Sequence, residues 1–194
     1  MKIALFGGTF NPFHIGHYEM LSEICKLDYI DKVLVLPTKI PPHKVLDTVV
    51  SDEDRINMCE LACFDFDKAQ LCLAEFEREG KSYTADTVKQ LKTVYPNAEF
   101  YIAIGGDMAN TLTSWYDTEY LFKNASFLAF CRSDEKIFNE SISDLKAQNV
   151  NITVIDKKIP DVSSSKLRKK LNKKLLPERI YDYITEKGLY NEEN

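Results

Sequence analysis

The residues best suited to chemistry lie in one short segment near the start of the chain, Gly7-Gly8-Thr9-Phe10-Asn11-Pro12-Phe13-His14-Ile15-Gly16-His17. An apolar run precedes this segment and an amphipathic stretch follows it, so the order is strand, glycine-rich turn and helix. Paired glycines after a parallel strand let backbone N–H groups approach a phosphate closely, and the following helix adds its positive N-terminus. The segment therefore predicts a nucleotide site.

His14 and His17 flank Gly16, so both imidazoles can face the bound phosphate if the chain turns there. Each ring can donate an N–H to a phosphate oxygen, and Gly16 carries no side chain that would block the approach. Two alternatives are a packed or surface role for each histidine and a metal site built on the pair. No third ligand lies nearby in the sequence, and the glycine-rich context favours phosphate. Gly7 and Gly8 join these residues as candidates for binding the nucleotide.

A second segment with phosphate-binding chemistry lies near the other end of the chain, at Val162-Ser163-Ser164-Ser165-Lys166-Leu167-Arg168. Its three hydroxyls and its guanidinium fall on the first turns of a predicted helix, where side chains and free N–H groups can bind phosphate oxygens. Arg168 would supply fixed charge to a departing pyrophosphate. The alternative is an N-cap serine followed by a solvated basic helix, and the segment alone does not choose between the two.

Two better-known phosphate motifs are excluded. Gly80-Lys81-Ser82 matches the end of a P-loop, but Glu75 stands where that motif needs its first glycine. The Gly-x-Gly-x-x-Gly pattern does not occur, so dinucleotide binding of the dehydrogenase type has no support.

The composition is that of an ordinary globular protein with an acidic balance. The 194 residues carry a formal net charge of −5, with 44% hydrophobic and 28% charged residues, and one domain covering 1–194 is expected. Nucleic acid and membrane partners are not expected, because the basic footprint they require is only local here. No stretch approaches the roughly 20 apolar residues of a membrane span, and the first apolar run is too short for a signal peptide, which predicts a cytoplasmic protein.

The five cysteines point to neither a disulfide framework nor a metal site. Their number is odd, and no two of them have the Cys-x-x-Cys spacing. We expect reduced, mostly buried thiols and no resident metal ion.

Short apolar runs alternate with amphipathic stretches along the chain. The strands are expected at 3–6, 33–36, 71–76, 100–104, 127–131 and 152–155, and helices between them at 16–27, 52–66, 84–95 and 118–123. This rhythm predicts an α/β fold with an open, doubly wound parallel sheet covered by helices. Ser51 is the predicted N-cap of the second helix, with three acidic residues in its first turn. Two C-terminal helices are expected at 164–173 and 177–187, the second closed by Gly188.

The early His-x-Gly-His element and the late Ser-Ser-Ser-x-x-Arg element together resemble the nucleotidyltransferase superfamily that includes class I aminoacyl-tRNA synthetases. Three further segments, Pro41-Pro42-His43-Lys44, Ser82-Tyr83-Thr84-x-Asp86-Thr87 and Gly105-Gly106-Asp107 with Trp115-Tyr116, are similar to bacterial nicotinate-nucleotide adenylyltransferase. The resemblance runs from Lys2 to Tyr190. It implies a Rossmann-like nucleotidyltransferase fold with C-terminal helices.

The resemblance also implies a reaction and a set of site residues. Members of that family transfer the adenylyl group of ATP to nicotinic acid mononucleotide, forming deamido-NAD in NAD biosynthesis, with Mg²⁺ accompanying ATP. The implied catalytic residues are His14, His17 and Arg168; the implied ATP-binding residues are Gly8, Thr9, Phe10, Asp107, Ser164 and Ser165, to which Gly7, Gly16 and Ser163 are added from the segments above. Those on the acceptor side are Lys44, Ser82, Tyr83, Thr84, Trp115, Tyr116 and Arg132.

Simpler roles exist for several acceptor-side residues. A single tryptophan is usually a core or edge anchor, Thr84 can cap the helix that follows, and Lys44 can be a solvated lysine. The chain departs from the family pattern at Gly106, at Cys131 and at Ser165, and none of these departures removes a required chemical group.

Three competing functions remain to be weighed. The nearest is pantetheine-phosphate adenylyltransferase or another small-molecule nucleotidyltransferase, although the Trp115-Tyr116 and Ser82-Tyr83-Thr84 segments speak against it. A nucleotide-binding module without turnover is the second, and a fragment of a transfer-RNA synthetase is the third, disfavoured by the acidic charge. The sequence leaves open the preference for nicotinate over nicotinamide, the identity of the metal and whether the chain forms a homo-oligomer.

Overall fold

The structure is a computed structural model of the chain, and it describes residues 1–42, 50–131 and 135–190. Six strands form one parallel sheet: β1 (Lys2–Gly8), β2 (Lys32–Pro37), β3 (Ala69–Leu71), β4 (Glu99–Gly105), β5 (Ala125–Phe130) and β6 (Ile152–Ile155). Eight α-helices accompany them in the described part of the chain: α1 (Ile15–Lys26), α2 (Asp52–Cys63), α3 (Thr84–Val94), α4 (Gly106–Ala109), α5 (Thr118–Asn124), α6 (Glu135–Ala147), α7 (Ser164–Lys169) and α8 (Glu178–Glu186).

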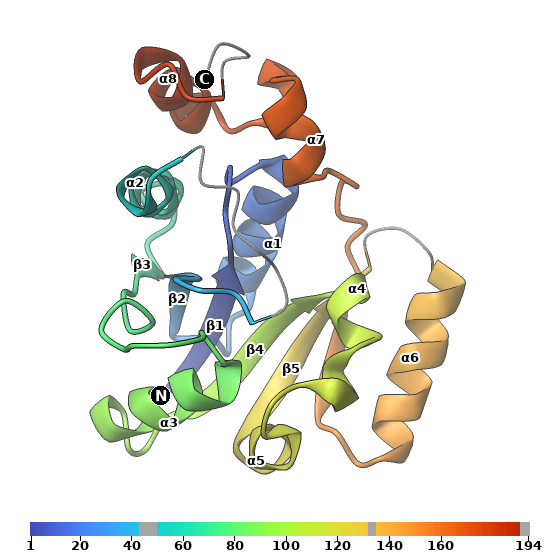
Figure 1. Cartoon of the computed structure of the whole chain (residues 1–194). Helices are drawn as coiled ribbons and strands as arrows, with labels where there is room; N and C mark the ends of the chain where they lie inside the picture. Colours follow the sequence, from blue (N-terminus) through green and yellow to red (C-terminus); the bar gives the residue numbers. More distant parts are fainter. Residues whose placement is uncertain (43–49, 132–134, 191–194) are drawn as a thin grey trace.

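The strand order is β3-β2-β1-β4-β5-β6, with every neighbouring pair parallel. The chain starts in the middle of the sheet, builds outward through β2 and β3, and then returns to the other side of β1 with β4 (Figure 1). This is the doubly wound order in which ligands bind outside the carboxyl ends of the strands at the switch point, here between β1 and β4. The predicted α/β fold with an open parallel sheet is confirmed.

Each face of the sheet is covered by its own set of helices. Alternate strand residues such as Ala4, Phe6 and Val35 pack in one apolar cluster with α1, α2, α7 and α8. The residues between them, such as Leu5 and Ile104, pack in the other cluster with α3, α5 and α6. The two-residue period of each strand therefore separates the core into two layers.

The N-terminus of α2 forms as predicted. Ser51 is the N-cap, and its hydroxyl accepts a hydrogen bond of 3.0 Å from the backbone N–H of Asp54. Asp52, Glu53 and Asp54 occupy the first turn, where negative charge suits the helix dipole. The helix ends at Cys63 rather than at Phe66, because Phe64 is already the C-cap.

Several predicted boundaries differ from the structure, and the largest differences are in β3, β5 and α7. The third strand covers only Ala69–Leu71, because a turn closed by hydrogen bonds to the Leu73 carbonyl occupies the rest of the predicted range 71–76. β5 begins two residues earlier than expected. α7 stops at Lys169, where the chain becomes extended at Lys170, and a separate 3₁₀ turn follows at Lys173–Leu175. Helix α6 was not predicted.

The end of α8 follows the predicted pattern. Gly188 takes the left-handed conformation with φ of 63°, and the Leu189 N–H bonds to the Ile184 carbonyl at 2.9 Å. These are the features of a glycine-terminated helix. Figure 1 shows α7 and α8 together beyond the end of the sheet, beside α1 and α2.

Candidate functional site

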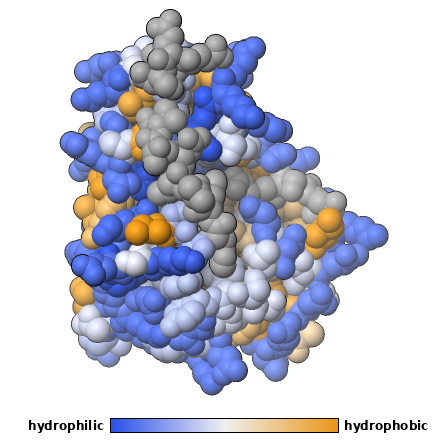
Figure 2. Space-filling model, in the orientation of Figure 1, coloured by the Kyte–Doolittle hydropathy of each residue, from blue (hydrophilic) through white to orange (hydrophobic). Residues whose placement is uncertain are grey.

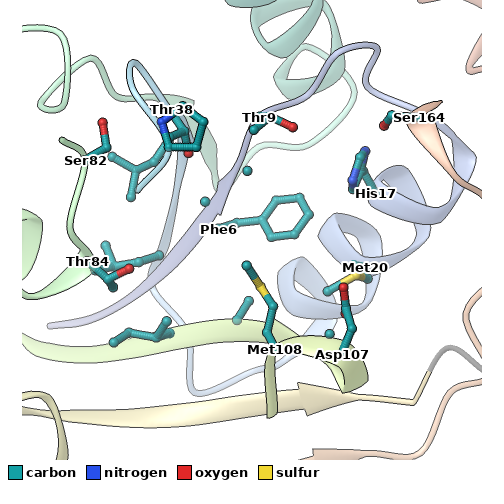
Figure 3. Close-up of a pocket in the computed structure, with 18 of the residues that line it drawn as sticks. Phe6, Thr9, His17, Met20, Thr38, Ser82, Thr84, Asp107, Met108 and Ser164 are labelled. Carbon is teal, nitrogen blue, oxygen red and sulfur yellow. The ribbon is translucent and has the colours of Figure 1, made fainter. Parts of the chain in front are cut away.

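A cavity of about 610 Å³ opens where β1 and β4 end. It is lined by Gly7 and Gly8 of β1, Gly105 at the end of β4, and residues of the segments that follow these strands. Figure 3 shows His17 and Ser164 on one side of the cavity and Ser82 and Thr84 on the opposite side, with Thr9 between the two groups. Its size is in the range typical of small-molecule sites. In Figure 2 the face of the molecule viewed in Figure 1 is largely hydrophilic, with small apolar patches.

His14 and His17 hold each other in a reciprocal arrangement at the start of α1. Nδ1 of His14 accepts the backbone N–H of His17 at 3.3 Å, and Nδ1 of His17 accepts the backbone N–H of His14 at 3.3 Å. The two rings are stacked, with centroids 3.6 Å apart. A neutral imidazole that accepts on Nδ1 carries its proton on Nε2. The helix terminus therefore makes the Nε2 atoms of both rings hydrogen-bond donors.

Aromatic packing places the second histidine. The His17 ring lies edge-on to Phe10 and Phe13, with centroids 5.1 and 5.3 Å away. Phe10 itself is fully buried, so it supports the site from the core rather than lining the cavity. A Cβ on Gly8 would lie 2.9 Å from the Phe10 ring. The packing of Phe10 therefore requires glycine at position 8, in addition to any role of Gly8 in phosphate binding.

The C-terminal segment closes on the loop that carries the histidines. Ser164 donates a hydrogen bond to the Pro12 carbonyl at 3.2 Å, and Arg168 donates to the Asn11 carbonyl at 2.9 Å and to Ser165 at 3.3 Å. Ser163, Ser164 and Ser165 all line the cavity, whereas Arg168 lies behind the loop. The two segments that suggested phosphate chemistry are therefore neighbours in space.

Arg55 does not line the cavity, but it bonds two loops that do. This side chain is 1% exposed, and Nη1 donates to the carbonyls of Thr9 and Thr38 at 2.9 and 2.8 Å. Its Nη2 meets Asp52 at 2.5 Å. Both threonines line the cavity, so one guanidinium fixes the loops that follow β1 and β2.

Sequence reasoning missed Arg55, although a signal was present. Arg55 stands three, four and seven residues before Met58, Cys59 and Ala62, which form the buried stripe of α2. A charged residue on such a stripe needs internal hydrogen-bond partners.

The opposite wall is built from the segment before α3. The Ser82 N–H donates to the Ile40 carbonyl at 2.8 Å, and the Ser82 hydroxyl accepts the Ile40 N–H at 3.2 Å. α3 starts at Thr84, with Tyr83 as an N-cap that makes no side-chain bond, so capping is not the role of the Thr84 hydroxyl. The Tyr83 ring packs on Tyr116 with centroids 4.4 Å apart. These contacts join 82–84 to Ile40, which follows β2, and to Tyr116, which follows α4.

Trp115 lies in the cavity wall and is partly exposed. Its Nε1 donates to the Thr111 hydroxyl at 3.4 Å, and its carbonyl accepts from Thr118 at 2.5 Å. The ring is packed at the edge of the second apolar cluster rather than inside it. A flat indole face at a cavity suits an aromatic ligand.

Glu75 is a buried carboxylate in the same wall, and it was also missed. Oε1 accepts from the Thr87 hydroxyl at 3.3 Å, while Oε2 is buried and has no hydrogen-bond partner among the described residues. Burial raises the pKa of Glu75 above its usual value, against the opposing effect of Ser82, Thr87 and Arg78. The sequence holds only a weak signal for a buried carboxylate. Glu75 is the one charged residue in the otherwise apolar run 71–76.

Most predicted site residues meet at this one cavity: Gly7, Gly8, Thr9, His14, His17, Ser82, Tyr83, Thr84, Asp107, Trp115, Tyr116, Ser163, Ser164 and Ser165. Phe10, Gly16 and Arg168 stand behind its lining. Gly16 is buried in the first turn of α1. Lys44 and Arg132 lie outside the described residues.

Metal-binding clusters and membrane-spanning helices are described here for residues 1–42, 50–131 and 135–190. No group of three or more His, Cys, Asp or Glu side chains in these ranges is arranged to hold a metal ion. No helix in the same ranges is long and apolar enough to cross a membrane. No disulfide joins the five cysteines, all of which lie in the described ranges; two are buried and three are partly buried.

Comparison with known proteins agrees with the geometry. The family described as cytidylyltransferase-like matches residues 5–170. A Bacillus cytotoxicus protein named "Probable nicotinate-nucleotide adenylyltransferase" is 40% identical, covering 97% of this chain and 98% of its own. A protein of the same name from Carboxydothermus hydrogenoformans is 35% identical over the same shares of the two chains.

Solved structures show the same fold. Plasmodium falciparum nicotinic acid mononucleotide adenylyltransferase complexed with APC is 25% identical with a TM-score of 0.76, covering 97% of this chain and 96% of that one. The same enzyme complexed with NaAD is 26% identical with a TM-score of 0.74, covering 97% of each chain. Because the match is nearly full-length in both sequence and structure, the chain belongs to the cytidylyltransferase-like family and, within it, to the nicotinate-nucleotide adenylyltransferases.

Proposed function

We propose that this protein transfers the adenylyl group of ATP to the phosphate of nicotinic acid mononucleotide, giving deamido-NAD and pyrophosphate. The observation that carries the proposal is that one cavity is lined by the stacked histidines and the serine-rich segment and also by Tyr83, Tyr116 and Trp115. A relative captured with NaAD, the dinucleotide that this reaction forms, supports the same reading.

The ATP side of the cavity is rich in donors. His14 and His17 present Nε2 donors, and Ser163, Ser164 and Ser165 add hydroxyls. Donors that are already oriented before the substrate arrives stabilise charge that develops on phosphate oxygens. We assign the triphosphate to this side. Arg168 holds the loop through the Asn11 carbonyl, and its contact with pyrophosphate stays a prediction because Arg168 does not line the cavity.

The acceptor side suits a pyridine ring that carries a carboxylate. Trp115 and Tyr116 offer flat faces for the ring, and the start of α3 at Thr84 offers backbone N–H groups for the carboxylate. Ser82 and Tyr83 hold that segment in place. Lys44 and Arg132 remain predicted contacts of the acceptor, and both lie outside the described residues.

The chemistry needs no general base. A phosphate monoester has a second pKa of about 6, so an acceptor oxygen is already anionic at neutral pH. That oxygen forms the new bond to the α-phosphorus of ATP, and the bond from this phosphorus to the bridging oxygen of pyrophosphate breaks. The protein contributes by positioning the two substrates and by placing donors at the α-phosphate.

Magnesium fits this site as a companion of ATP. The described residues contain no three-ligand cluster for a resident ion, and Mg²⁺ commonly binds through substrate phosphates, water and one or two carboxylates. Asp107 and Asp161 are the aspartates that line the cavity. When bound, the ion screens the triphosphate charge.

The test supplies purified protein with ATP, Mg²⁺ and either nicotinic acid mononucleotide or nicotinamide mononucleotide, and measures both the dinucleotide and pyrophosphate. We expect dinucleotide and pyrophosphate in equal amounts, with the nicotinate substrate preferred. Turnover with phosphopantetheine, but with neither mononucleotide, would show that the protein is a pantetheine-phosphate adenylyltransferase instead. ATP binding without turnover on any acceptor would indicate a silent nucleotide-binding module.

A further inference from the structure

The tyrosine at the end of the described chain reaches back to the loop before α1. The Tyr190 hydroxyl donates a hydrogen bond of 2.6 Å to the side-chain carbonyl of Asn11, which lies 179 positions earlier in the sequence. Both residues are buried, with 6% of Tyr190 and 3% of Asn11 exposed. A hydrogen bond in such a setting is shielded from competing water.

The fold directs Tyr190 to this position. α8 ends at Glu186, Gly188 turns the chain with φ of 63°, and Tyr190 itself has a positive φ of 62°. A positive φ is uncommon for a bulky side chain and persists when surrounding contacts hold it. The Tyr190 ring is part of the apolar cluster that contains α1, α2 and α8.

The loop that Tyr190 contacts carries the first part of the nucleotide site. Between β1 and α1 the backbone belongs to neither a strand nor a helix, so contacts from distant elements hold it. Arg55 bonds Thr9, Arg168 bonds the Asn11 carbonyl, and Ser164 bonds Pro12. Tyr190 bonds the side chain of Asn11, which lies three residues before the N-cap His14.

We propose that Tyr190 is a positioning residue for nucleotide binding: its hydroxyl holds Asn11, and through Asn11 the backbone that leads from Gly8 to His14. This inference rests on the proposed function of the same cavity. Tyr190 does not line the cavity, so it acts on ATP only through the loop.

Tyr190→Phe removes the hydroxyl and keeps the ring, which preserves the apolar packing. We expect the Kd of a non-hydrolysable ATP analogue, measured by calorimetry with Mg²⁺, and the KM for ATP each to rise about 5- to 10-fold, the size that loss of one buried hydrogen bond gives. The KM for the acceptor is expected to stay within about twofold, because Tyr83 and Trp115 are held by other contacts.

Tyr183→Phe is the matched control. The Tyr183 hydroxyl also joins the C-terminal helix to the rest of the chain, donating to Asp54 at 2.8 Å and accepting from Asn57 at 3.0 Å, but its partners lie on α2. We expect this variant to lose thermal stability and to keep the wild-type affinity for the ATP analogue. An equal change of analogue Kd in both variants would mean that Tyr190 acts through general stability, and would overturn the proposal.

A double-mutant cycle tests whether Asn11 is the route. In an Asn11→Ala background, Tyr190→Phe is expected to change the analogue Kd by less than about twofold, because the hydrogen bond between the two side chains is already absent. Additive effects of the two substitutions would contradict the proposal, as would an unchanged Kd in folded Tyr190→Phe protein.

The binding readout also separates this inference from the proposed function. A wild-type protein that binds the analogue but adenylates neither mononucleotide would refute the acceptor assignment, and the Kd comparison would still decide the role of Tyr190. A wild-type protein that does not bind the analogue would overturn both.

Discussion

At the scale of single residues, the stacked pair of histidines shows how a backbone can set the protonation geometry of a site. Each Nδ1 accepts a main-chain N–H of the other residue, so the turn at the start of α1 assigns the Nε2 proton to both rings. The capping box therefore has two effects at once: it satisfies N–H groups at the helix terminus, and it orients two donors.

His17→Ala is expected to lower kcat for dinucleotide formation by about 100-fold or more, because one oriented donor to the transition state is lost. The same change opens the capping box, so we expect an accompanying loss of roughly 1 kcal/mol in the free energy of unfolding. Steady-state rates and thermal unfolding followed by circular dichroism measure the two effects separately. A folded variant with near-normal adenylation would remove His17 from the reaction.

The sequence predicted best those cavity residues whose positions are set by the neighbouring strand or helix. The glycines, histidines and serines follow directly on a strand or precede a helix, so their spacing already places them at the carboxyl edge of the sheet. Arg55 and Glu75 were missed because their roles depend on partners 12 to 46 positions away. Such pairs form only when the tertiary fold brings α2 and the segment before α3 against the cavity.

At the scale of elements, α2 serves the site through one side chain. The helix packs on the sheet with its apolar stripe. Arg55, in its first turn, bonds the carbonyls of Thr9 and Thr38 in the cavity wall. A guanidinium can bond three groups in fixed directions, which an ammonium cannot match.

Arg55→Lys is therefore expected to lower the free energy of unfolding by about 1–3 kcal/mol even though the charge is kept, because hydrogen bonds to Thr9 and Thr38 are lost or weakened. Arg179→Lys is the control, since Arg179 pairs with Asp65 at an exposed site and is expected to contribute less than about 1 kcal/mol. Urea denaturation of both variants provides the measurement. Equal stability of the two variants would show that the bonds of Arg55 add nothing.

Among the elements, the sequence predicted the central strands well, and it predicted β3 and α6 poorly. Strands β1, β2 and β4 are buried apolar runs in the centre of the sheet, and their periodicity was unambiguous. β3 is an edge strand of three residues, and the apolar residues after it fill a turn, so apolar character misled the prediction. In α6 the apolar positions Phe138, Ile142 and Leu145 have helical spacing, but the polar residues between them include weak helix formers.

At the scale of the whole molecule, the raised pKa of Glu75 in the cavity wall makes the free energy of unfolding depend on pH. Burial raises the folded-state pKa above the usual value, so the folded protein holds this proton more tightly than the unfolded chain does. The resulting contribution to stability is complete at pH values below the ordinary carboxyl pKa. It is lost as the pH rises through the folded-state pKa.

Glu75→Gln keeps the shape of the side chain and removes the ionisation. Relative to the wild type, the variant is expected to gain stability as the pH rises from about 4 to 7, by about 1.4 kcal/mol for each unit by which the pKa is raised. Unfolding free energies at several pH values provide the measurement, with Glu186→Gln at the exposed end of α8 as a control for the change in net charge. A stability difference independent of pH would show that Glu75 is ionised alike in both states.

The contact between Tyr190 and Asn11 also bears on when the protein can first become competent during synthesis. The loop after β1 emerges from the ribosome well before its partners at Ser164, Arg168 and Tyr190, which are translated 152 to 179 residues later. At about 5–20 residues per second that interval lasts roughly 10 to 40 seconds. A nascent chain therefore exposes its glycine-rich segment long before the contacts that shape it exist, and the proposed ATP site is complete only after Tyr190 has been translated.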